Sequence, residues 1–246
     1  MVQMASMRFT LGLMYTPELL LRTNLTEAHE ASWQAIGEPG AFWTGPERVQ
    51  MVAHARAATN CKLCEQRKAA LSPFAVTGEH DEISRESELP PALIDAIHRI
   101  LSDPGRLTRS VFAQVIAAGV SEAAYVEMVS VINSSVIIDT LHRSLGLSLP
   151  ELPEAREGEV SGDYNTEAID RGAWVRVLDA DQDLFEPGMP RVPNILRSMG
   201  LVPSAVQLFF QTFRPHYALA NIPLSISQAQ AEFVAARVSA LNECFY

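Results

Sequence analysis

The chain has 246 residues, of which 48% are hydrophobic, and a formal net charge of -10. A chain of this length can bury one large core or two modest ones. The negative charge argues against a nucleic-acid partner, because phosphate binding requires a basic surface and the sequence contains no basic stripe. No apolar run is long enough to span a bilayer, and Pro17 and Glu18 interrupt the apolar start of the chain. We therefore expect neither a signal peptide nor a membrane partner.

The sequence contains three cysteines, at Cys61, Cys64 and Cys244. This small, odd number argues against the disulfide framework of an extracellular protein, which requires paired cysteines. Free thiols are typical of a reducing compartment. We therefore expect a cytoplasmic protein.

Helix signals dominate the chain and predict an all-α fold. Caps such as Thr26 and Ser121 precede apolar residues at helical spacing, and glycine or proline follows where a pattern ends. Alternation with a period of two occurs only briefly, at residues 174–177. The expected helices cover residues 27–36, 46–58, a further helix capped by Asn60, then 91–102, 111–118, 122–145, 194–199, 203–213 and 228–241.

The composition changes between residues 147 and 193, where five prolines punctuate a stretch rich in acidic residues and glycine. We expect this Pro-rich stretch to connect two helical regions, residues 1–146 and 194–246. We also expect it to wrap one of them, because Trp174 requires a buried position.

Cys61 and Cys64 form a C-x-x-C motif. If Asn60 caps a helix, both thiols lie in its first turn, on one face and within reach of each other for a disulfide. The unpaired N–H groups and the dipole at a helix N-terminus favour the thiolate, which is the reactive form of cysteine. A thiolate beside a resolving cysteine can reduce a peroxide or a disulfide, so the motif indicates redox chemistry.

Two other interpretations of the motif remain open. The cysteines are also typical of small buried hydrophobic residues. Together, Cys61, Cys64, His80 and His98 have the residue types of a structural zinc site, and His80 lies in a loop from which it can approach the cysteines. Their spacing matches no zinc-finger pattern, and we place His98 at the polar edge of its helix, so we expect no metal and no other cofactor.

Other polar residues receive structural interpretations. We expect Glu127 to form a buried ion pair with Arg106 or Arg109. We expect Asp139 and His142 to form a surface or interface pair, because one helix face cannot assemble a hydrolase triad.

The last fifteen residues, 232–246, resemble the signature helix of the AhpD-like alkylhydroperoxidases, within the carboxymuconolactone decarboxylase superfamily. That signature is a glutamate, eleven residues, a cysteine, two residues, a second cysteine, three residues and a histidine. Glu232 and Cys244 match it, and the sequence stops before the second cysteine. Residues 47–68 and 91–146 are more distantly similar to the same superfamily. The resemblance implies an AhpD-like helical bundle, with one diverged unit in residues 1–146 and the start of a second in 194–246.

The resemblance also implies an activity and its residues. Members are all-α, assemble as trimers or hexamers, and reduce peroxides with the cysteine pair, using a thiol or protein reductant. Carried over, Cys64 attacks the peroxide and Cys61 resolves the product. Lys68 stands at the position of the family histidine, and Val49 stands at that of the glutamate, with Glu47 nearby.

The expected function is therefore that of a thiol-dependent peroxidase or disulfide oxidoreductase. It would act on a small-molecule peroxide in a homo-oligomer. One alternative is a catalytically degenerate member that serves as an oligomeric binding or scaffold protein. Another is the lactone decarboxylase chemistry of the wider superfamily, which requires no cysteine.

Overall fold

The computed structural model describes residues 14–15, 19–80, 87–179, 192–217 and 224–241. Within these ranges the chain is helical and has no strand, which confirms the all-α expectation. Residues 174–177 form no strand, and only an isolated bridge joins Ile169 to Val177. The α-helices are α1 (Thr23–Gly37), α2 (Gly45–Ala58), α3 (Lys62–Ala69), α4 (Pro91–Ser102), α5 (Arg109–Ala117), α6 (Glu122–Ser144), α7 (Asn194–Met199), α8 (Pro203–Phe213) and α9 (Gln228–Leu241), with short 3-10 turns η1 (Pro73–Ala75) and η3 (Pro104–Arg106).

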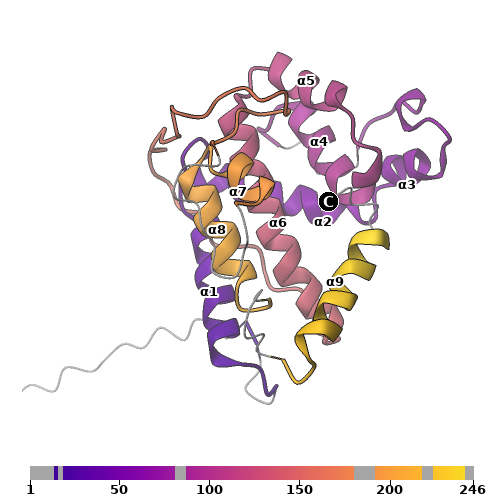
Figure 1. Cartoon of the computed structure of the whole chain (residues 1–246). Coiled ribbons are helices and arrows are strands. Elements are labelled where there is room, and N and C mark those ends of the chain that lie inside the picture. The colour runs from indigo at the N-terminus through magenta and orange to yellow at the C-terminus, as the bar shows by residue number, and fades with distance from the viewer. Residues whose placement is uncertain (1–13, 16–18, 81–86, 180–191, 218–223, 242–246) are drawn as a thin grey trace, which may run out of the picture.

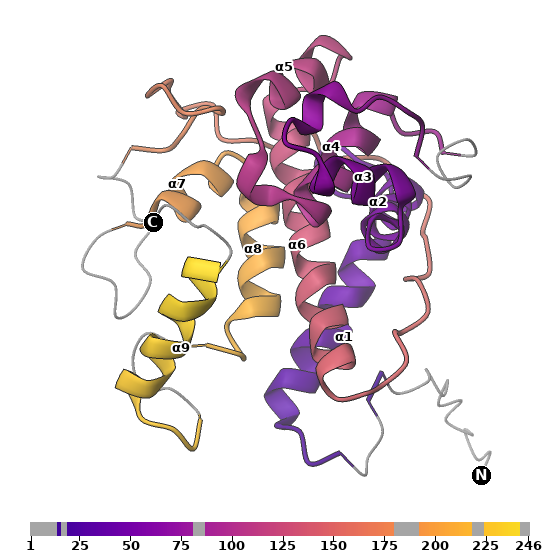
Figure 2. The same ribbon diagram turned by 90° about the vertical axis from the view of Figure 1, so that its right-hand side faces the viewer.

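Helix α6 is the central element of the bundle, and α1, α2 and α8 pack around it (Figures 1 and 2). Ser121 caps α6 as expected, since its Oγ accepts a hydrogen bond from the Ala124 N–H at 3.1 Å. By length and composition alone α6 could cross a membrane, so the expectation that no apolar run is long enough was wrong. Its most apolar stretch is 61% buried inside the bundle, as in the core helix of a globular protein.

Helices α1 and α3 begin elsewhere than their expected caps. Helix α1 starts at Thr23, before the expected cap Thr26. Helix α3 starts at Lys62 with Cys61 as its extended N-cap residue, because the Asn60 N–H still bonds to Ala57 O in the turn that ends α2. The expectation that Asn60 caps this helix was therefore wrong.

One hydrophobic core joins residues from both sides of the Pro-rich stretch. Leu201 and Ala205 of the α7–α8 region belong to the same buried cluster as Met51 of α2 and Met128 of α6. The described part of the stretch packs on the bundle, since the Trp174 ring stacks on Phe112 with centroids 6.2 Å apart, but Trp174 is half-buried and not buried as expected. The division into units at residues 147 and 194 stays a prediction.

Glycine lets the Pro-rich stretch lie directly on the junction of α1 and α2. The Arg156 N–H donates to Gly37 O at 2.9 Å. A Cβ on Gly45 would lie 2.1 Å from Gly37 O and 2.4 Å from Arg156 O. Because both neighbours are backbone atoms, this approach is open only to glycine.

A chain of hydrogen bonds ties the start of the bundle to the residues after α8. The Tyr15 hydroxyl lies 2.5 Å from His29 Nδ1, and His29 Nε2 lies 2.7 Å from His216 Nε2. Arg22 also donates to the Pro215 carbonyl. Burial, followed by the nearby His216 and His142, lowers the pKa of His29 to about 3, so His29 is neutral in the fold.

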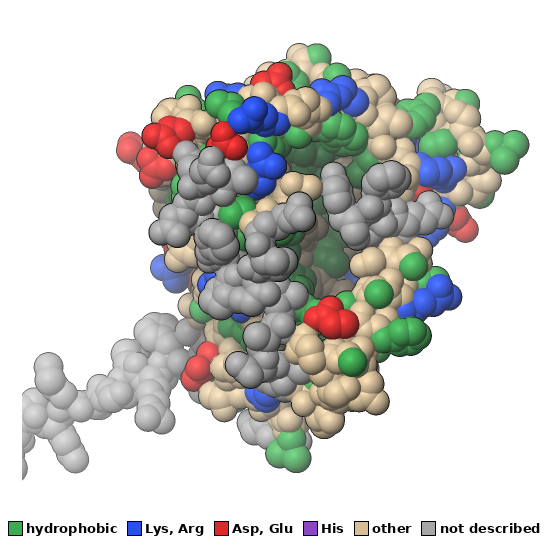
Figure 3. All heavy atoms as spheres, viewed as in Figure 1, with side chains coloured by type: hydrophobic (Ala, Val, Ile, Leu, Met, Phe, Trp, Pro, Cys, Tyr) green, Lys and Arg blue, Asp and Glu red, His purple; other side chains and the backbone are tan. Residues whose placement is uncertain are grey.

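Helix α9 stands beside the bundle (Figure 1), and several of its apolar side chains are exposed. Its capping box matches the sequence expectation, because Gln230 Oε1 accepts from the Ser227 N–H at 2.9 Å. Phe233 is 74% exposed and Leu241 is 64% exposed. A hollow with hydrophobic side chains at its floor opens in the face next to α9 (Figure 3).

Candidate functional site

The C-x-x-C motif lies where α3 packs on α4. Cys61 is the N-cap residue of α3 and Cys64 lies in its first turn, so both sulfurs project from the same end of the helix. Both are free thiols. His98 comes from α4, and His80 comes from the segment that follows η1. Three separate segments therefore contribute to one cluster.

The two histidines face the two sulfurs. Cys61 Sγ lies 3.4 Å from His80 Nδ1, and Cys64 Sγ lies 3.9 Å from the same nitrogen. Cys64 Sγ also lies 3.4 Å from His98 Nδ1. The sequence expectation that His80 can approach the cysteines is confirmed.

The cluster is buried. Cys61 and Cys64 are each 2% exposed, and His98 is fully buried. The expectation that His98 lies at a polar edge of its helix was wrong, because α4 is packed against both α2 and α3. A helix with two packed faces hides residues that a single apolar stripe would leave in solvent.

Asp95 holds the His80 ring on the side opposite the sulfurs, and it was not predicted from the sequence. Its Oδ1 accepts from His80 Nε2 at 3.0 Å and from Arg67 Nη1 at 2.5 Å, while its Oδ2 accepts from Arg99 Nε at 2.7 Å. Asp95 lies three residues before His98 and therefore on the same side of α4. No local pattern in the sequence pairs Asp95 with His80, which lies fifteen residues earlier in the chain.

The hydrogen bonds of the cluster stabilise charge on His80. Burial lowers the pKa of His80, but hydrogen bonds with Asp95 and with both thiols outweigh it and raise the pKa to about 10. Burial raises the pKa of the Cys61 thiol, but the His80 contact and those with Cys64 bring it below its ordinary value. For His98, burial and then the charge of His80 lower the pKa to about 3. In the protein without metal, this arrangement favours a thiolate beside an imidazolium.

The residues expected as helpers of the cysteines lie elsewhere or make other contacts. Glu47 belongs to the capping box of α2, where its carboxylate accepts from the Thr44 N–H and hydroxyl, each at 2.8 Å. Lys68 is exposed on the last turn of α3. Glu232 is exposed on α9 and accepts from Gln228 at 2.7 Å. Cys244 lies outside the described residues, and the catalytic roles of all four stay predictions.

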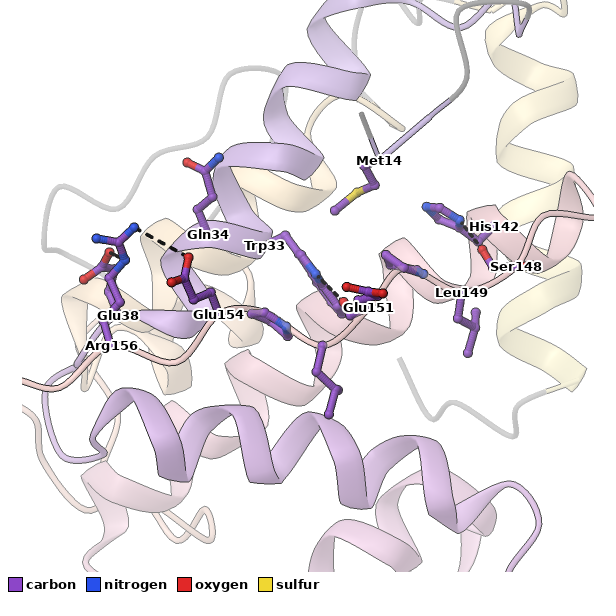
Figure 4. Close-up of a pocket in the computed structure, with 13 residues that line it drawn as sticks. Met14, Trp33, Gln34, Glu38, His142, Ser148, Leu149, Glu151, Glu154 and Arg156 are labelled. Carbon is purple, nitrogen blue, oxygen red and sulfur yellow. Dashed lines mark hydrogen bonds and ion pairs between the residues drawn. The ribbon is translucent and has the colours of Figure 1, made fainter. Parts of the chain in front are cut away.

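A pocket of about 570 Å³ opens between α1, the end of α6 and the start of the Pro-rich stretch (Figure 4). Its polar groups largely bond to the chain itself. Trp33 Nε1 donates to Glu151 O at 3.0 Å, and His142 Nδ1 donates to Ser148 O at 2.9 Å. It therefore lacks the converging reactive groups that distinguish the thiol cluster.

Three expected surface or ion-pair assignments need correction. Asp139 and His142 are buried, and Asp139 binds Arg56 through both carboxylate oxygens, at 2.8 and 2.9 Å. Glu127 is buried in an ion pair as expected, but its partner is Arg48 of α2, at 3.5 Å. Arg106 instead pairs with Asp103. It also donates hydrogen bonds to the backbone carbonyls at the end of α3 and so caps that helix.

The comparisons with known proteins identify no relative. No protein-family model, no curated protein and no solved structure matches this chain. The AhpD-like resemblance therefore stays a prediction.

Proposed function

We propose that the chain is a thiol-redox protein of the AhpD-like type, in which Cys61 and Cys64 cycle between dithiol and disulfide. One observation carries the proposal. His80 Nδ1 lies within contact of both sulfurs, while Asp95 binds the opposite nitrogen and fixes the ring. An aspartate that holds a histidine, which in turn contacts a thiol, is an arrangement in which the histidine can act as the base that activates the thiol.

The reaction balances with a peroxide as oxidant and an external thiol as reductant. One thiolate of the pair attacks a peroxide oxygen, the O–O bond breaks, and an alcohol or water leaves with a proton from His80. The resulting sulfenic acid condenses with the second thiol to give the disulfide and water. Two equivalents of a small thiol or a protein dithiol then reduce the disulfide. On this proposal His80 takes the proton-transfer role that the family resemblance gave to position 68.

Thiol counting in the Cys244→Ser background tests the proposal, because only the pair then remains. In the reduced, metal-free protein, one equivalent of hydrogen peroxide is expected to remove both thiols, and Cys61→Ser or Cys64→Ser is expected to abolish disulfide formation. His80→Gln is expected to slow the reaction by about 100-fold. His54→Gln is the matched control, because His54 is a buried histidine outside the group formed by Cys61, Cys64, His80 and His98. Thiols that persist through excess peroxide would overturn the proposal.

The burial of the pair favours a second candidate function. Cys61 and Cys64 are each only 2% exposed, so a peroxide reaches them only if the surrounding segments move. A catalytically degenerate binding or scaffold protein would keep such thiols for packing. Inert thiols in a protein that forms a stable oligomer would support this candidate.

A further inference from the structure

The four side chains around the motif have the composition of a tetrahedral metal site. The ligand atoms of Cys61, Cys64, His80 and His98 all lie within 4.8 Å of one another, and all four residues are buried. Two thiolates and two imidazoles are a donor set that zinc prefers. Among the described residues this is the one group of its kind.

The separations match those around a single ion. With Zn–S bonds of about 2.3 Å and Zn–N bonds of about 2.0 Å, a tetrahedral ion holds a sulfur and a nitrogen about 3.5 Å apart. Cys61 Sγ and His80 Nδ1 are 3.4 Å apart, and so are Cys64 Sγ and His98 Nδ1. The third such pair, Cys64 Sγ and His80 Nδ1, is 3.9 Å apart. An ion therefore fits between the four atoms, which all lie within 4.8 Å of one another, once the wider separations close.

The surroundings of His80 are those of a metal ligand. Its Nδ1 faces the sulfurs, and its Nε2 donates to Asp95 Oδ1 at 3.0 Å. A carboxylate behind a histidine fixes the tautomer that a metal requires and orients the ring. Arg67 and Arg99 hold Asp95 in turn.

The apolar packing around the motif is limited, although polar contacts such as the Arg67–Asp95 ion pair also join α3 to α4. Cys61, Leu63 and Cys64 form a small hydrophobic cluster of their own, with Val76 packed against it, separate from the main core. Helix α3 has only 8 residues. Such a small cluster gains stability from a metal that crosslinks it to the neighbouring helix.

We infer that Cys61, Cys64, His80 and His98 bind one Zn²⁺ ion, or a similar thiophilic divalent cation, in a tetrahedral site that joins α3 to α4. Binding displaces two protons, one from a thiol and one from the His80 imidazolium, so two thiolates balance the ion and neutral imidazoles complete the site without net charge. This inference goes beyond the redox proposal and stands on the ligand geometry alone. The two are connected in one respect: a bound ion occupies both sulfurs, and oxidation to the disulfide would release it.

Cobalt substitution of the whole chain provides the test. The protein is reduced, stripped of metal and titrated with Co²⁺ under anaerobic conditions. One equivalent is expected to give the intense visible bands of tetrahedral cobalt and a thiolate-to-cobalt charge-transfer band, and Zn²⁺ is expected to displace it. His98→Gln is expected to abolish this spectrum, while His54→Gln, the same change in the neighbouring buried ring, is expected to retain it. Asp95→Asn is expected to weaken metal affinity about 10- to 100-fold.

The outcomes separate the two proposals. Weak, octahedral cobalt binding by the wild-type protein would overturn the metal site without reference to any variant. A spectrum unchanged in His98→Gln would also overturn it, because that histidine is one of the four ligands. Tetrahedral cobalt binding by a protein whose metal-free thiols are inert to peroxide would support the metal site and overturn the redox function. Peroxide oxidation of the pair without stoichiometric metal binding would do the reverse.

Discussion

Substitution of Glu127 tests whether the buried pair that it forms with Arg48 is charged. Their side chains are 8% and 2% exposed, and Arg48 Nε lies 3.5 Å from Glu127 Oε1. Glu127→Gln keeps the carbonyl oxygen that can accept from the Phe42 N–H, which Glu127 Oε2 binds at 2.7 Å, but it removes the negative charge. The substitution therefore leaves Arg48 charged and buried without its ion-pair partner, with the more distant charge of Glu38 remaining.

The cost follows from the separation. At 3.5 Å the Coulomb attraction is about 5 kcal/mol for an effective dielectric constant of about 20. Removing one partner of a buried pair typically costs about 3–5 kcal/mol, so we expect Glu127→Gln to lower the free energy of unfolding by that amount. Arg48→Met combined with Glu127→Gln removes both charges. The double variant is expected to cost at least about 2 kcal/mol less than the sum of the single variants.

Urea unfolding followed by circular dichroism measures these differences. Glu122→Gln is the matched control on the same helix, because Glu122 pairs with Arg176 at 3.1 Å where the side chains are 33% and 41% exposed. We expect this control to cost about 1 kcal/mol or less. A Glu127→Gln cost no larger than the control, or strictly additive single variants, would refute the reasoning. It would mean that the carboxyl of Glu127 is neutral, the state that burial favours by raising its pKa.

Three further predictions concern pH and local structure. Because the pKa of His29 is about 3 in the fold and about 6.5 in the unfolded chain, its contribution to stability is full above pH ~6.5 and falls on acidification. The loss reaches about 2 kcal/mol near pH ~5, and His29→Gln is expected to remove this part of the pH dependence of urea unfolding. Gly45→Ala is expected to cost about 1–3 kcal/mol, because a Cβ meets the backbone oxygens of Gly37 and Arg156; an unchanged melting temperature would contradict that close approach. Thr44→Ala removes the cap of α2 and is expected to cost about 1 kcal/mol in the same thermal assay, which Thr44→Ser would largely restore.

The bounds of a helix were predictable where residues at its own ends define them. Pro91 and Asp103 bracket α4, and Pro193 and Gly200 bracket α7, so both helices have the expected bounds. The start of α3 was not predictable, because Asn60 remains in the turn that ends α2. The presence of a typical cap residue in the sequence does not show whether the backbone at that position still belongs to the preceding helix or starts the next one.

The candidate site was predictable in its thiols and less so in their partners. The spacing of Cys61 and Cys64 is a local signal, and their proximity to each other follows from it. The burial of His98 depends on α3 covering a face of α4 that the apolar stripe does not mark. Asp95 acts on a histidine fifteen residues earlier in the chain, and only the packed structure brings the two together. The periodicity of apolar residues marks one buried face of a helix and does not reveal a second.

The hydrogen bond between His29 and His216 has a consequence for the synthesis of this protein. His29 belongs to α1, yet its partner imidazole lies 187 residues further along the chain. At about 5–20 residues per second, a ribosome takes roughly 10 to 40 s to reach it. Helix α8, which precedes His216, also packs against α1. During that interval the part of α1 that α8 covers in the fold is exposed on the nascent chain, although α2 and α6 are already synthesised, and a chaperone would have most to protect there.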